Sequence, residues 1–315
     1  TTKNYLNNFK NKTVLDIGCN DGSLLNLYKG KGAITVGVEP TGAALDAKKN
    51  GHKIFPKYFD RETASKLLKK HKKFDLIIFT NVFAHIENLK LLIKNLKSLI
   101  SEETILLIEN HYFGSIIKKN QFDTFYHEHP RTYSATSFLF IAKQLGMNID
   151  QIEFPKRYGG NIRVIFTKKK TNFKKSIIIN KEKHFLKEIF EMQKRVNKWK
   201  QTKKNFINTL YLKHGPMIAK AFPGRAAILV RLLGLNKKII SGVFEKEGSM
   251  KIGNYVPGTK IPIKPDTELF KIMNSFKIII NFSWHISKEI KRYLRSNGYK
   301  GKIYNIIEKK DFTKH

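Results

Sequence analysis

The sequence has little cysteine, few acidic residues and no long apolar run. Its 315 residues include a single cysteine, Cys19, which excludes a disulfide framework and a zinc site made of cysteines. No apolar stretch approaches the roughly 18 residues that a membrane-spanning helix needs, and the first residues lack the apolar core of a signal peptide. We therefore expect a cytoplasmic protein without a membrane partner. Because the sequence begins at Thr1 rather than at a methionine, we also expect that an upstream segment is missing.

Acidic residues are scarce beside basic ones. The chain has 25 Asp and Glu against 60 Lys and Arg, which gives a formal net charge of +35 at pH 7. Such an excess favours nucleic acid as a partner, because cations that neutralise phosphates release counterions. The chain is also rich in Lys, Ile and Asn together, which is the composition that AT-rich codons give to a whole proteome. We favour this second explanation, so a nucleic-acid partner is not expected despite the charge.

The apolar content is sufficient for packed domains. Hydrophobic residues make up 41% of the chain and aromatic residues 12%, which excludes intrinsic disorder, and the length corresponds to about two domains of ~150 residues. In the first third, short apolar runs alternate with helical patterns. The predicted strands are 13–17, 34–38, 52–55, 74–79 and 104–109, and the predicted helices are 23–29, 42–50, 61–70 and 88–100. This alternation predicts α/β architecture with a doubly wound parallel sheet.

The rest of the chain predicts an edge, a connector and a second unit. Apolar runs at 148–154 and 160–166 predict an antiparallel pair that completes the sheet. Residues 172–212 contain neither proline nor glycine and predict one or two lysine-rich helices. Further predicted elements are strands at 238–243, 276–281 and 302–305 and a helix at 287–296. We therefore expect a first domain of residues 1–171, a helical connector of residues 172–212 and a second, smaller α/β domain of residues 213–315.

A glycine-bearing turn follows the first predicted strand. Asp16, Gly18 and Gly22 form a turn in which the backbone approaches a ligand without an intervening Cβ, and the next helix offers unpaired N–H groups. Glu39 ends the second strand, where a carboxylate accepts hydrogen bonds from ribose hydroxyls. The turn lacks the G-x-G-x-x-G spacing of dinucleotide enzymes, and a plain strand-to-helix turn is the alternative.

The spacing of this turn, D-I-G-C-N-D-G, resembles the first motif of the class I methyltransferases. The resemblance implies a Rossmann-like methyltransferase fold in the first domain and S-adenosylmethionine as the cofactor. The second domain is expected to be Rossmann-like as well. The expected cofactor-binding residues are Asp16, Gly18, Asn20, Asp21, Gly22, Glu39 and Asn81.

Four ionisable or hydroxyl-bearing side chains are consecutive at Tyr126–His129. The imidazole has an unperturbed pKa suited to proton abstraction near neutral pH, so this segment is a candidate for general acid–base catalysis. A metal site is not expected, because His127 and His129 lack the i, i+4 helical spacing and no cysteines remain to complete a tetrahedron. A hydrogen-bonded loop without a catalytic function is the alternative.

Six segments carry a further resemblance. They are V-L-D-I-G-C-N-D-G-S-L-L (14–25), N-V-F-A-H (81–85), F-D-T-F-Y-H-E-H (122–129), G-G-N-I-R (159–163), K-I-G-N-Y-V-P-G-T-K-I-P-I (251–263) and S-W-H-I-S-K-E-I (283–290). In this order, over nearly the whole chain, they resemble the sugar C-methyltransferases, which act at C3 of nucleotide-linked 4-keto-deoxysugars. The resemblance implies that a base removes the C3 proton beside the C4 ketone and that the resulting enolate attacks the methyl group.

The same resemblance implies roles for individual residues. His129 is the expected base, Glu128 orients or polarises a neighbouring group, and Tyr126 hydrogen-bonds the sugar or its developing enolate oxygen. His85 is expected to line the sugar pocket, with capping of the following helix as the alternative. Arg163 is expected to hold the substrate diphosphate, together with some of Lys260, Lys251 and Arg225.

The sequence departs from the family at several points. Family members begin with a small four-cysteine zinc domain that helps to cover the sugar pocket, and this sequence contains no such domain. The family's His-Gly-Gly and the following Ser are Tyr158, Gly159, Gly160 and Asn161, and its Gly-Ala-x-x-Lys loop is replaced by residues 221–225. These changes concern the sugar and the nucleotide rather than the methyl donor. The alternatives left open are O- or N-methylation of another saccharide or of RNA, and a truncated remnant that binds the cofactor without activity.

Overall fold

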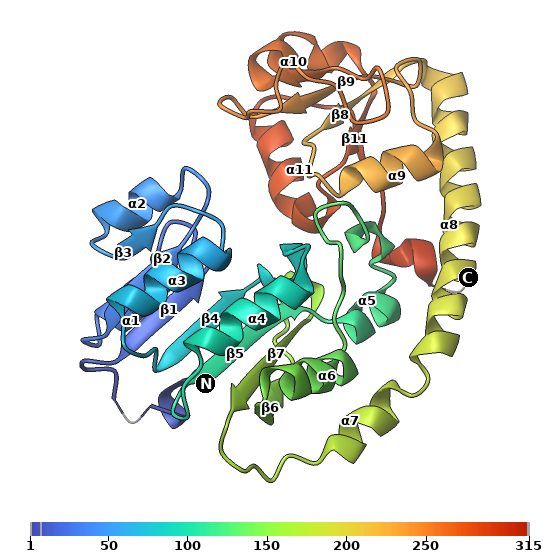
Figure 1. Cartoon of the computed structure of the whole chain (residues 1–315). Helices are drawn as coiled ribbons and strands as arrows, with labels where there is room; N and C mark the ends of the chain where they lie inside the picture. The colour runs from blue at the N-terminus through green and yellow to red at the C-terminus, as the bar shows by residue number, and fades with distance from the viewer. Residues whose placement is uncertain (1, 7, 314–315) are drawn as a thin grey trace. The chain divides into compact units, whose positions relative to one another are not determined.

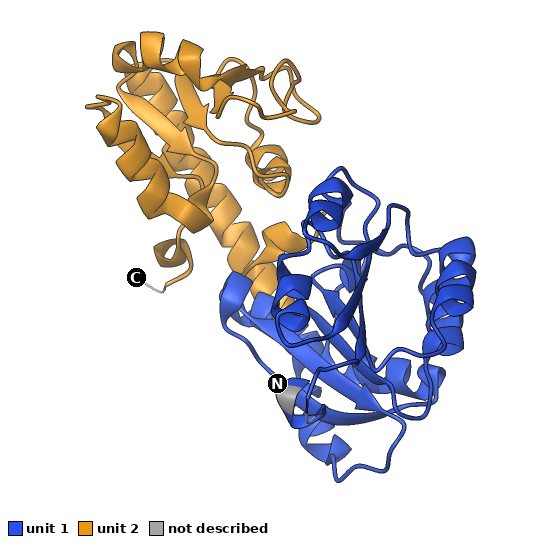
Figure 2. Cartoon of the chain, turned by 90° about the vertical axis from the view of Figure 1, so that its left-hand side faces the viewer, with its two compact units in different colours: residues 1–119, 127–187 blue, residues 120–126, 188–315 orange. Residues whose placement is uncertain are grey.

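The computed structural model describes residues 2–6 and 8–313. The chain forms two compact units (Figure 2). Residues 1–119 and 127–187 make the first unit, and residues 120–126 and 188–315 make the second. Each unit contains its own β-sheet. The prediction of two successive α/β units is confirmed.

The sheet of the first unit has the strand order β3-β2-β1-β4-β5-β7-β6 (Figure 1). The strands are β1 Thr13–Ile17, β2 Ile34–Val38, β3 Lys53–Phe55, β4 Leu76–Thr80, β5 Ile105–His111, β6 Asn148–Glu153 and β7 Asn161–Thr167. The first five strands along the chain pair in parallel, whereas β7 runs antiparallel to both β5 and β6. The predicted parallel sheet and its antiparallel edge are confirmed. The carboxyl ends of β2, β1 and β4 therefore meet at one edge, where doubly wound sheets bind ligands.

Helices connect these strands. The α-helices of the first unit are α1 Ser23–Lys29, α2 Ala44–Lys49, α3 Arg61–Lys70, α4 Leu89–Leu99, α5 Phe113–Lys119, α6 Ala135–Leu145 and α7 Lys175–Glu182, and its 3-10 helices are η1 Thr2–Asn4, η2 Phe83–His85 and η4 Arg157–Gly159. The helices α1 and α3 have the bounds that the sequence predicts. Neither α5 nor α6 was predicted, although Ser134 caps the first turn of α6 and Gly146 ends this helix in the left-handed conformation.

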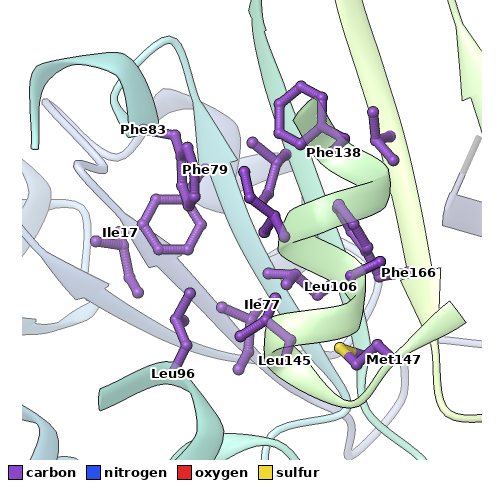
Figure 3. Close-up of a cluster of buried hydrophobic side chains, with 14 of the residues drawn as sticks. Ile17, Ile77, Phe79, Phe83, Leu96, Leu106, Phe138, Leu145, Met147 and Phe166 are labelled. Atoms are coloured by element: carbon purple, nitrogen blue, oxygen red, sulfur yellow. The ribbon is translucent and has the colours of Figure 1, made fainter. Parts of the chain in front are cut away.

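Alternate residues of the central strands face opposite sides of the sheet, so the first unit has two apolar layers. Leu15 and Ile17 of β1 join the cluster that packs against α3, α4 and α6, whereas Val14 joins the cluster that packs against α1 and α2. Figure 3 shows the first cluster, in which Phe79 at the end of β4 packs near Phe83. This layer fixes the segment that follows β4.

The second unit contains a smaller sheet of parallel strands in the order β10-β9-β8-β11-β12 (Figure 1). Its strands are β8 Met217–Lys220, β9 Ile240–Glu245, β10 Ile263–Pro265, β11 Ile278–Asn281 and β12 Lys302–Asn305. Its helices are α8 Phe185–His214, which begins at the end of the first unit, α9 Ala226–Leu233, α10 Asp266–Ile272 and α11 Ser287–Ser296, with the 3-10 helices η3 Phe122–Thr124, η5 Met273–Ser275, η6 Trp284–Ile286 and η7 Lys309–Phe312. The strands β8 and β10 were not predicted. A lysine ends the apolar run of β8, and β10 contains a lysine and a proline.

The short segment 120–126 belongs to the second unit, although it comes from the middle of the first. The ring of Phe122 lies 5.0 Å from that of Trp199 on α8. Asp123 is buried and forms an ion pair with Arg225 at the start of α9. Burial raises the pKa of Asp123, and the Arg225 guanidinium opposes this effect. The residues immediately before His127 are thus fixed within the second unit.

Candidate functional site

The turn between β1 and α1 has a backbone that requires glycine. Gly18 has φ 77° and Gly22 has φ 79°, both in the left-handed region. An added Cβ at Gly18 would clash with the side chain of Val82, and one at Gly22 would clash with the ring of His52. Both glycines are expected to bind a cofactor. Because they have no Cβ, they add no side chain over the backbone of this turn.

Glu39, directly after β2, is hydrogen-bonded to this turn. Its Oε2 accepts a hydrogen bond from the N–H of Asn20 at 3.0 Å, and its Oε1 accepts one from the N–H of Thr41 at 3.0 Å. Each carboxylate oxygen has a second lone pair. The structure brings Glu39 and Asn20 together and leaves the carboxylate able to accept ribose hydroxyls.

Asp16 places a second carboxylate near the turn. It is 2% exposed, and its Oδ1 has no hydrogen-bond partner among the described residues. Burial, and secondarily the charge of Glu39, raises the pKa of Asp16 to about 7. A cation bound here would stabilise the ionised form of Asp16. These residues therefore fit a cofactor that carries ammonium or sulfonium charge on a nucleoside.

Asp21 lies at the surface, at the start of α1. Its Oδ1 accepts a hydrogen bond from the N–H of Ser23 at 3.0 Å, and the hydrogen bonds to Ser23 lower the pKa of Asp21. The carboxylate of Asp21 is thus engaged in the turn itself and not with Asp16 or Glu39.

Asn81 follows β4, the strand next to β1. Its φ is 56°, and its N–H donates to the carbonyl oxygen of Glu109 at 2.8 Å. Its side-chain oxygen accepts a hydrogen bond from Nδ2 of Asn161 at 3.1 Å. The next residue, Val82, is the one that occupies the space left by Gly18. The structure therefore brings the Asn81 backbone to the turn that follows β1.

The expected catalytic residues lie against the 3-10 helix after β4. Nδ1 of His85 is 2.7 Å from the backbone oxygen of Glu128, and the rings of His85 and His129 are 4.7 Å apart with an interplanar angle of 67°. His129 is half-buried, whereas the side chain of His127 is 82% exposed and lies 3.9 Å from the Glu128 carboxylate. The structure thus places His85 and His129 together at the carboxyl end of β4.

Tyr126 is half-buried and is the last residue of the segment 120–126 that belongs to the second unit. His127, Glu128 and His129 belong to the first unit. The four consecutive residues therefore span the boundary between the two compact units in the chain.

Arg163 lies on β7, opposite Glu109 on β5. Its guanidinium is 2.7 Å from Glu109 and 2.8 Å from Glu153. Two protein carboxylates therefore balance its charge, and a diphosphate at Arg163 would have to compete with both of them.

The other cations expected near a diphosphate lie in the second unit. Lys260 lies beside a hollow of about 630 Å³, lined also by Asn236, Lys237, Lys238, Gly258 and Thr259. These residues precede β9 and β10, so Lys260 lies toward the amino ends of the strands. Arg225 and Lys251 instead lie at the loop after β8: the guanidinium of Arg225 is 4.9 Å from the ring centroid of Trp284, and Nζ of Lys251 donates to the carbonyl oxygen of Phe222 at 2.7 Å.

Two acidic residues that were not predicted as site residues each stabilise the region around them within their own unit. Glu109 pairs with Arg157 and Arg163, which are about 50 residues away in sequence and are recognisable as partners only when β5 pairs with β7. Glu245, at the end of β9, accepts a hydrogen bond from the N–H of Phe222 at 2.5 Å. Glu245 could have been recognised from the sequence, because it is an acidic residue at the carboxyl end of a strand, like Glu39.

Within residues 2–6 and 8–313, no three His, Cys, Asp or Glu side chains are grouped so that they could hold a metal ion. Over the same residues, no helix has the length and apolar character to cross a membrane.

Two family models match the chain in succession. A model described as a methyltransferase domain matches residues 2–152, and a model described as a C-methyltransferase C-terminal domain matches residues 156–304. The strand order of the first sheet is that of the class I methyltransferase fold, as the sequence predicts.

Curated relatives match shorter stretches. The C-methyltransferase NovU of Streptomyces niveus is 28% identical over 152 residues, which are 48% of this chain and 36% of NovU. A ubiquinone biosynthesis O-methyltransferase of Glaesserella parasuis serovar 5 is 33% identical over 118 residues, 33% of this chain and 49% of that protein. The chain thus spans less than half the length of each of these relatives. Among solved structures, the magnesium protoporphyrin IX methyltransferase (ChlM) of Synechocystis PCC 6803 with bound SAH is 17% identical, covers 52% of this chain and 77% of that one, and has a TM-score of 0.41.

Proposed function

We propose that this S-adenosylmethionine-dependent methyltransferase acts on C3 of a nucleotide-linked 4-keto-deoxysugar, with His129 as the base. The match of residues 156–304 to a C-methyltransferase C-terminal domain supports carbon as the methyl acceptor, and so does the name of the relative NovU. The six sequence segments that resemble the sugar C-methyltransferases support the keto-sugar.

The observation that carries the proposal is the contact between His129 and the segment after β4. His85 contacts both the ring of His129 and the backbone of Glu128, and its own segment follows Asn81 and Val82 at the cofactor turn. An imidazole is thus held near the carboxyl end of the strand that adjoins the cofactor strand. That is where a base must lie if it is to act on a carbon facing the donated methyl group.

In this proposal the cofactor supplies an electrophilic methyl group on a sulfonium. Asp16 would balance its positive charge, the backbone at Gly18 would lie against it, and Glu39 would accept hydrogen bonds from its ribose. His129 takes the C3 proton of the sugar, whose electron pair forms the enolate and then the new carbon–carbon bond. The cofactor would supply the methyl group for this bond and would keep the electron pair of the sulfur–methyl bond.

The neighbours of His129 are proposed to bind and polarise the sugar. Tyr126 donates a hydrogen bond to the C4 oxygen, where negative charge grows as the enolate forms. Glu128 orients a neighbouring polar group, and His85 lines the sugar side of the site. All four residues act on the acceptor, and none of them is needed to bind the cofactor.

The second unit is proposed to bind the nucleotide part of the substrate. Arg225 and Lys251 lie at the loop after β8 and present positive charge there, and Glu245 at the end of β9 lies where a ribose is bound in such folds. We assign the diphosphate to Lys251 and to Arg225, which pairs with one carboxylate, that of Asp123. Arg163 pairs with two carboxylates, and Lys260 lies toward the amino ends of the strands.

Mass spectrometry of the sugar tests the proposal. A nucleotide-linked 4-keto-6-deoxyhexose is incubated with the protein and S-adenosylmethionine in deuterated water, beside the variants His129→Ala and His127→Ala. We expect a methylated sugar from the unmutated protein and from His127→Ala, whose imidazole is exposed, and none from His129→Ala.

The other possible outcomes show which part of the proposal is wrong. Deuterium at C3 without methylation would support the base and point to a site that needs the zinc domain of the family, which can then be supplied by fusion. Methylation of a sugar that lacks the C4 ketone would favour an O- or N-methyltransferase. Cofactor binding with neither deuterium nor methyl transfer on any keto-sugar would overturn the proposal and favour a remnant.

A further inference from the structure

A chain of polar side chains lies where β4 and β5 end and where the antiparallel strand β7 begins. Glu109 is 1% exposed and Asn161 is fully buried. Nδ2 of Asn161 donates to Oε1 of Glu109 at 2.8 Å and to Oδ1 of Asn81 at 3.1 Å. One amide nitrogen therefore joins a carboxylate on β5 to the residue that ends β4.

Glu109 fixes which end of the Asn161 amide points toward it. Arg157 and Arg163 each donate to the Glu109 carboxylate at 2.7 Å. Burial opposes ionisation of Glu109, but these bonds and the one from Asn161 outweigh it and lower its pKa. An ionised carboxylate only accepts hydrogen bonds, so Asn161 must present its NH2 group to Glu109.

The same reasoning fixes the amide of Asn81. Because Asn161 presents a donor, Asn81 must present its oxygen to Asn161, and its own NH2 group is then directed elsewhere. The Asn81 backbone has little freedom, since its N–H is bonded to the carbonyl oxygen of Glu109 and Val82 packs into the space at Gly18. The polarity of the Asn81 amide is thus defined, and the backbone that carries it adjoins Val82, which packs at the cofactor turn.

We propose that Asn161 is a positioning residue that, held by Glu109, sets the Asn81 amide to donate a hydrogen bond to the carboxylate of the methionine part of S-adenosylmethionine. The order of strands supports this choice of acceptor. Glu39 ends β2 on one side of β1 and takes the ribose, so the amino-acid end of the cofactor extends toward β4 on the other side. The inference rests on the cofactor placement between Glu39 and Asn81 given above, and it requires no particular sugar.

Binding measurements with two probes test the inference by calorimetry. S-adenosylhomocysteine carries the methionine-derived carboxylate, and 5′-deoxy-5′-methylthioadenosine lacks it. Asn81→Asp keeps an oxygen facing Asn161 and tolerates the left-handed backbone, but it replaces the ligand-facing donor with an acceptor. We expect Asn81→Asp to lower the affinity for S-adenosylhomocysteine roughly 10- to 100-fold and to change the affinity for methylthioadenosine less than about 2-fold.

The variant Asn161→Leu tests the positioning role. This variant leaves the Asn81 amide in place without fixing its polarity. We therefore expect the affinity for S-adenosylhomocysteine to fall roughly 3- to 10-fold and the affinity for methylthioadenosine to stay unchanged. In the double variant with Asn81→Asp, Asn161→Leu should add no further loss, because the donor that it orients is already gone. If Asn161 had a purely structural role, Asn161→Leu would lower the affinity for both probes equally.

Asn110→Leu is the matched control. Asn110 is also buried on β5, both of its amide atoms lack a partner among the described residues, and it lies on the opposite face of the strand from Glu109. It should leave both affinities unchanged. Equal affinities of wild type and Asn81→Asp for S-adenosylhomocysteine would overturn the inference, as would parallel losses for both probes. Neither result bears on the sugar, which is tested by methylation alone.

Discussion

The two sheets of the molecule carry the same turn after their first strand. In the first unit, the N–H of Gly18 donates to the carbonyl of the residue before Glu39 at 2.8 Å, and in the second, the N–H of Ala221 donates to the carbonyl of the residue before Glu245 at 2.8 Å. Both residues are left-handed, with φ 77° and 63°. In each unit the acid at the end of the second strand then accepts a hydrogen bond from a backbone N–H of the turn.

The two turns differ in charge. The first has the buried carboxylate of Asp16, whose Oδ1 has no partner among the described residues. The second has a buried carboxylate, Asp266, that is 2.8 Å from the ammonium of Lys220 and also accepts a hydrogen bond from Tyr293 at 2.7 Å. Lys251 also lies at the second turn, where its Nζ donates to the carbonyl oxygen of Phe222. In the described part of the chain, the same backbone therefore carries a buried carboxylate without a cation in the first unit and a buried carboxylate paired with lysine in the second. This difference agrees with a cationic cofactor in the first unit and with the anionic substrate group that we propose for the second.

Breaking the Lys220–Asp266 pair should have the largest effect on this contrast. Lys220 and Asp266 are 1% and 2% exposed, so Lys220→Met leaves Asp266 as a buried carboxylate with the Tyr293 hydroxyl as a donor but with no cation. We expect a loss of about 3–5 kcal/mol in the free energy of unfolding, measured by urea denaturation.

Two variants sharpen this measurement. Lys264→Met removes a surface pair with Glu268, whose side chains are 42% and 47% exposed, and it should cost less than about 1 kcal/mol. Adding Asp266→Asn to Lys220→Met should restore part of the lost stability. A loss for Lys220→Met no larger than that for Lys264→Met would mean that Asp266 is solvated and that the two turns do not differ as described.

The pH dependence of cofactor binding should show the next largest effect. Asp16, with its pKa raised to about 7, is largely neutral at pH 6 and ionised at pH 8. Because the ionised form attracts the cationic cofactor, we expect affinity for S-adenosylmethionine to rise about tenfold from pH 6 to pH 8 by calorimetry. Asp16→Asn should bind weakly and show no such rise.

The stability of the free protein should change in the opposite direction. A carboxyl with a raised pKa binds its proton more tightly when folded, so its contribution to stability is present below pH 4 and is lost as the pH rises through about 7. Thermal unfolding of the free protein and of Asp16→Asn over this range separates the two effects. If Asp16→Asn retained the full rise in affinity, the carboxylate at the turn would not be the group that titrates.

The fold of the first unit was largely predictable, because its strands are apolar runs and its helices are amphipathic between them. The helices α1 and α3 and the strand β2 have the predicted bounds. The second unit was less predictable, since Lys220 places a charged residue at the end of the buried strand β8, and β10 contains a lysine and a proline. Lys220 is explained only by Asp266, which is 46 residues away in sequence.

The candidate site was predictable where one segment carries the chemistry. The turn at Gly18–Gly22, Glu39 and the residues Tyr126–His129 each stand out in the sequence, and the structure brings His129 to His85. The contacts that fix polarity were not predictable. Asn161 is 52 residues from Glu109 and 80 residues from Asn81 in sequence. No local sequence pattern indicates that these residues become neighbours in the sheet.

The smallest effect is expected where the two turns have the same backbone but different residues. Ala221→Gly relieves a left-handed alanine, which favours folding by about 1–2 kcal/mol, but it frees the unfolded chain and removes a buried methyl group, which together oppose it by a similar amount. We therefore expect a change of less than about 1 kcal/mol in urea denaturation. The reciprocal Gly18→Ala should lower stability clearly more, because its Cβ meets Val82 in the first unit. A loss for Gly18→Ala as small as the change for Ala221→Gly would show that Val82 accommodates the added Cβ and that its packing does not require glycine at the first turn.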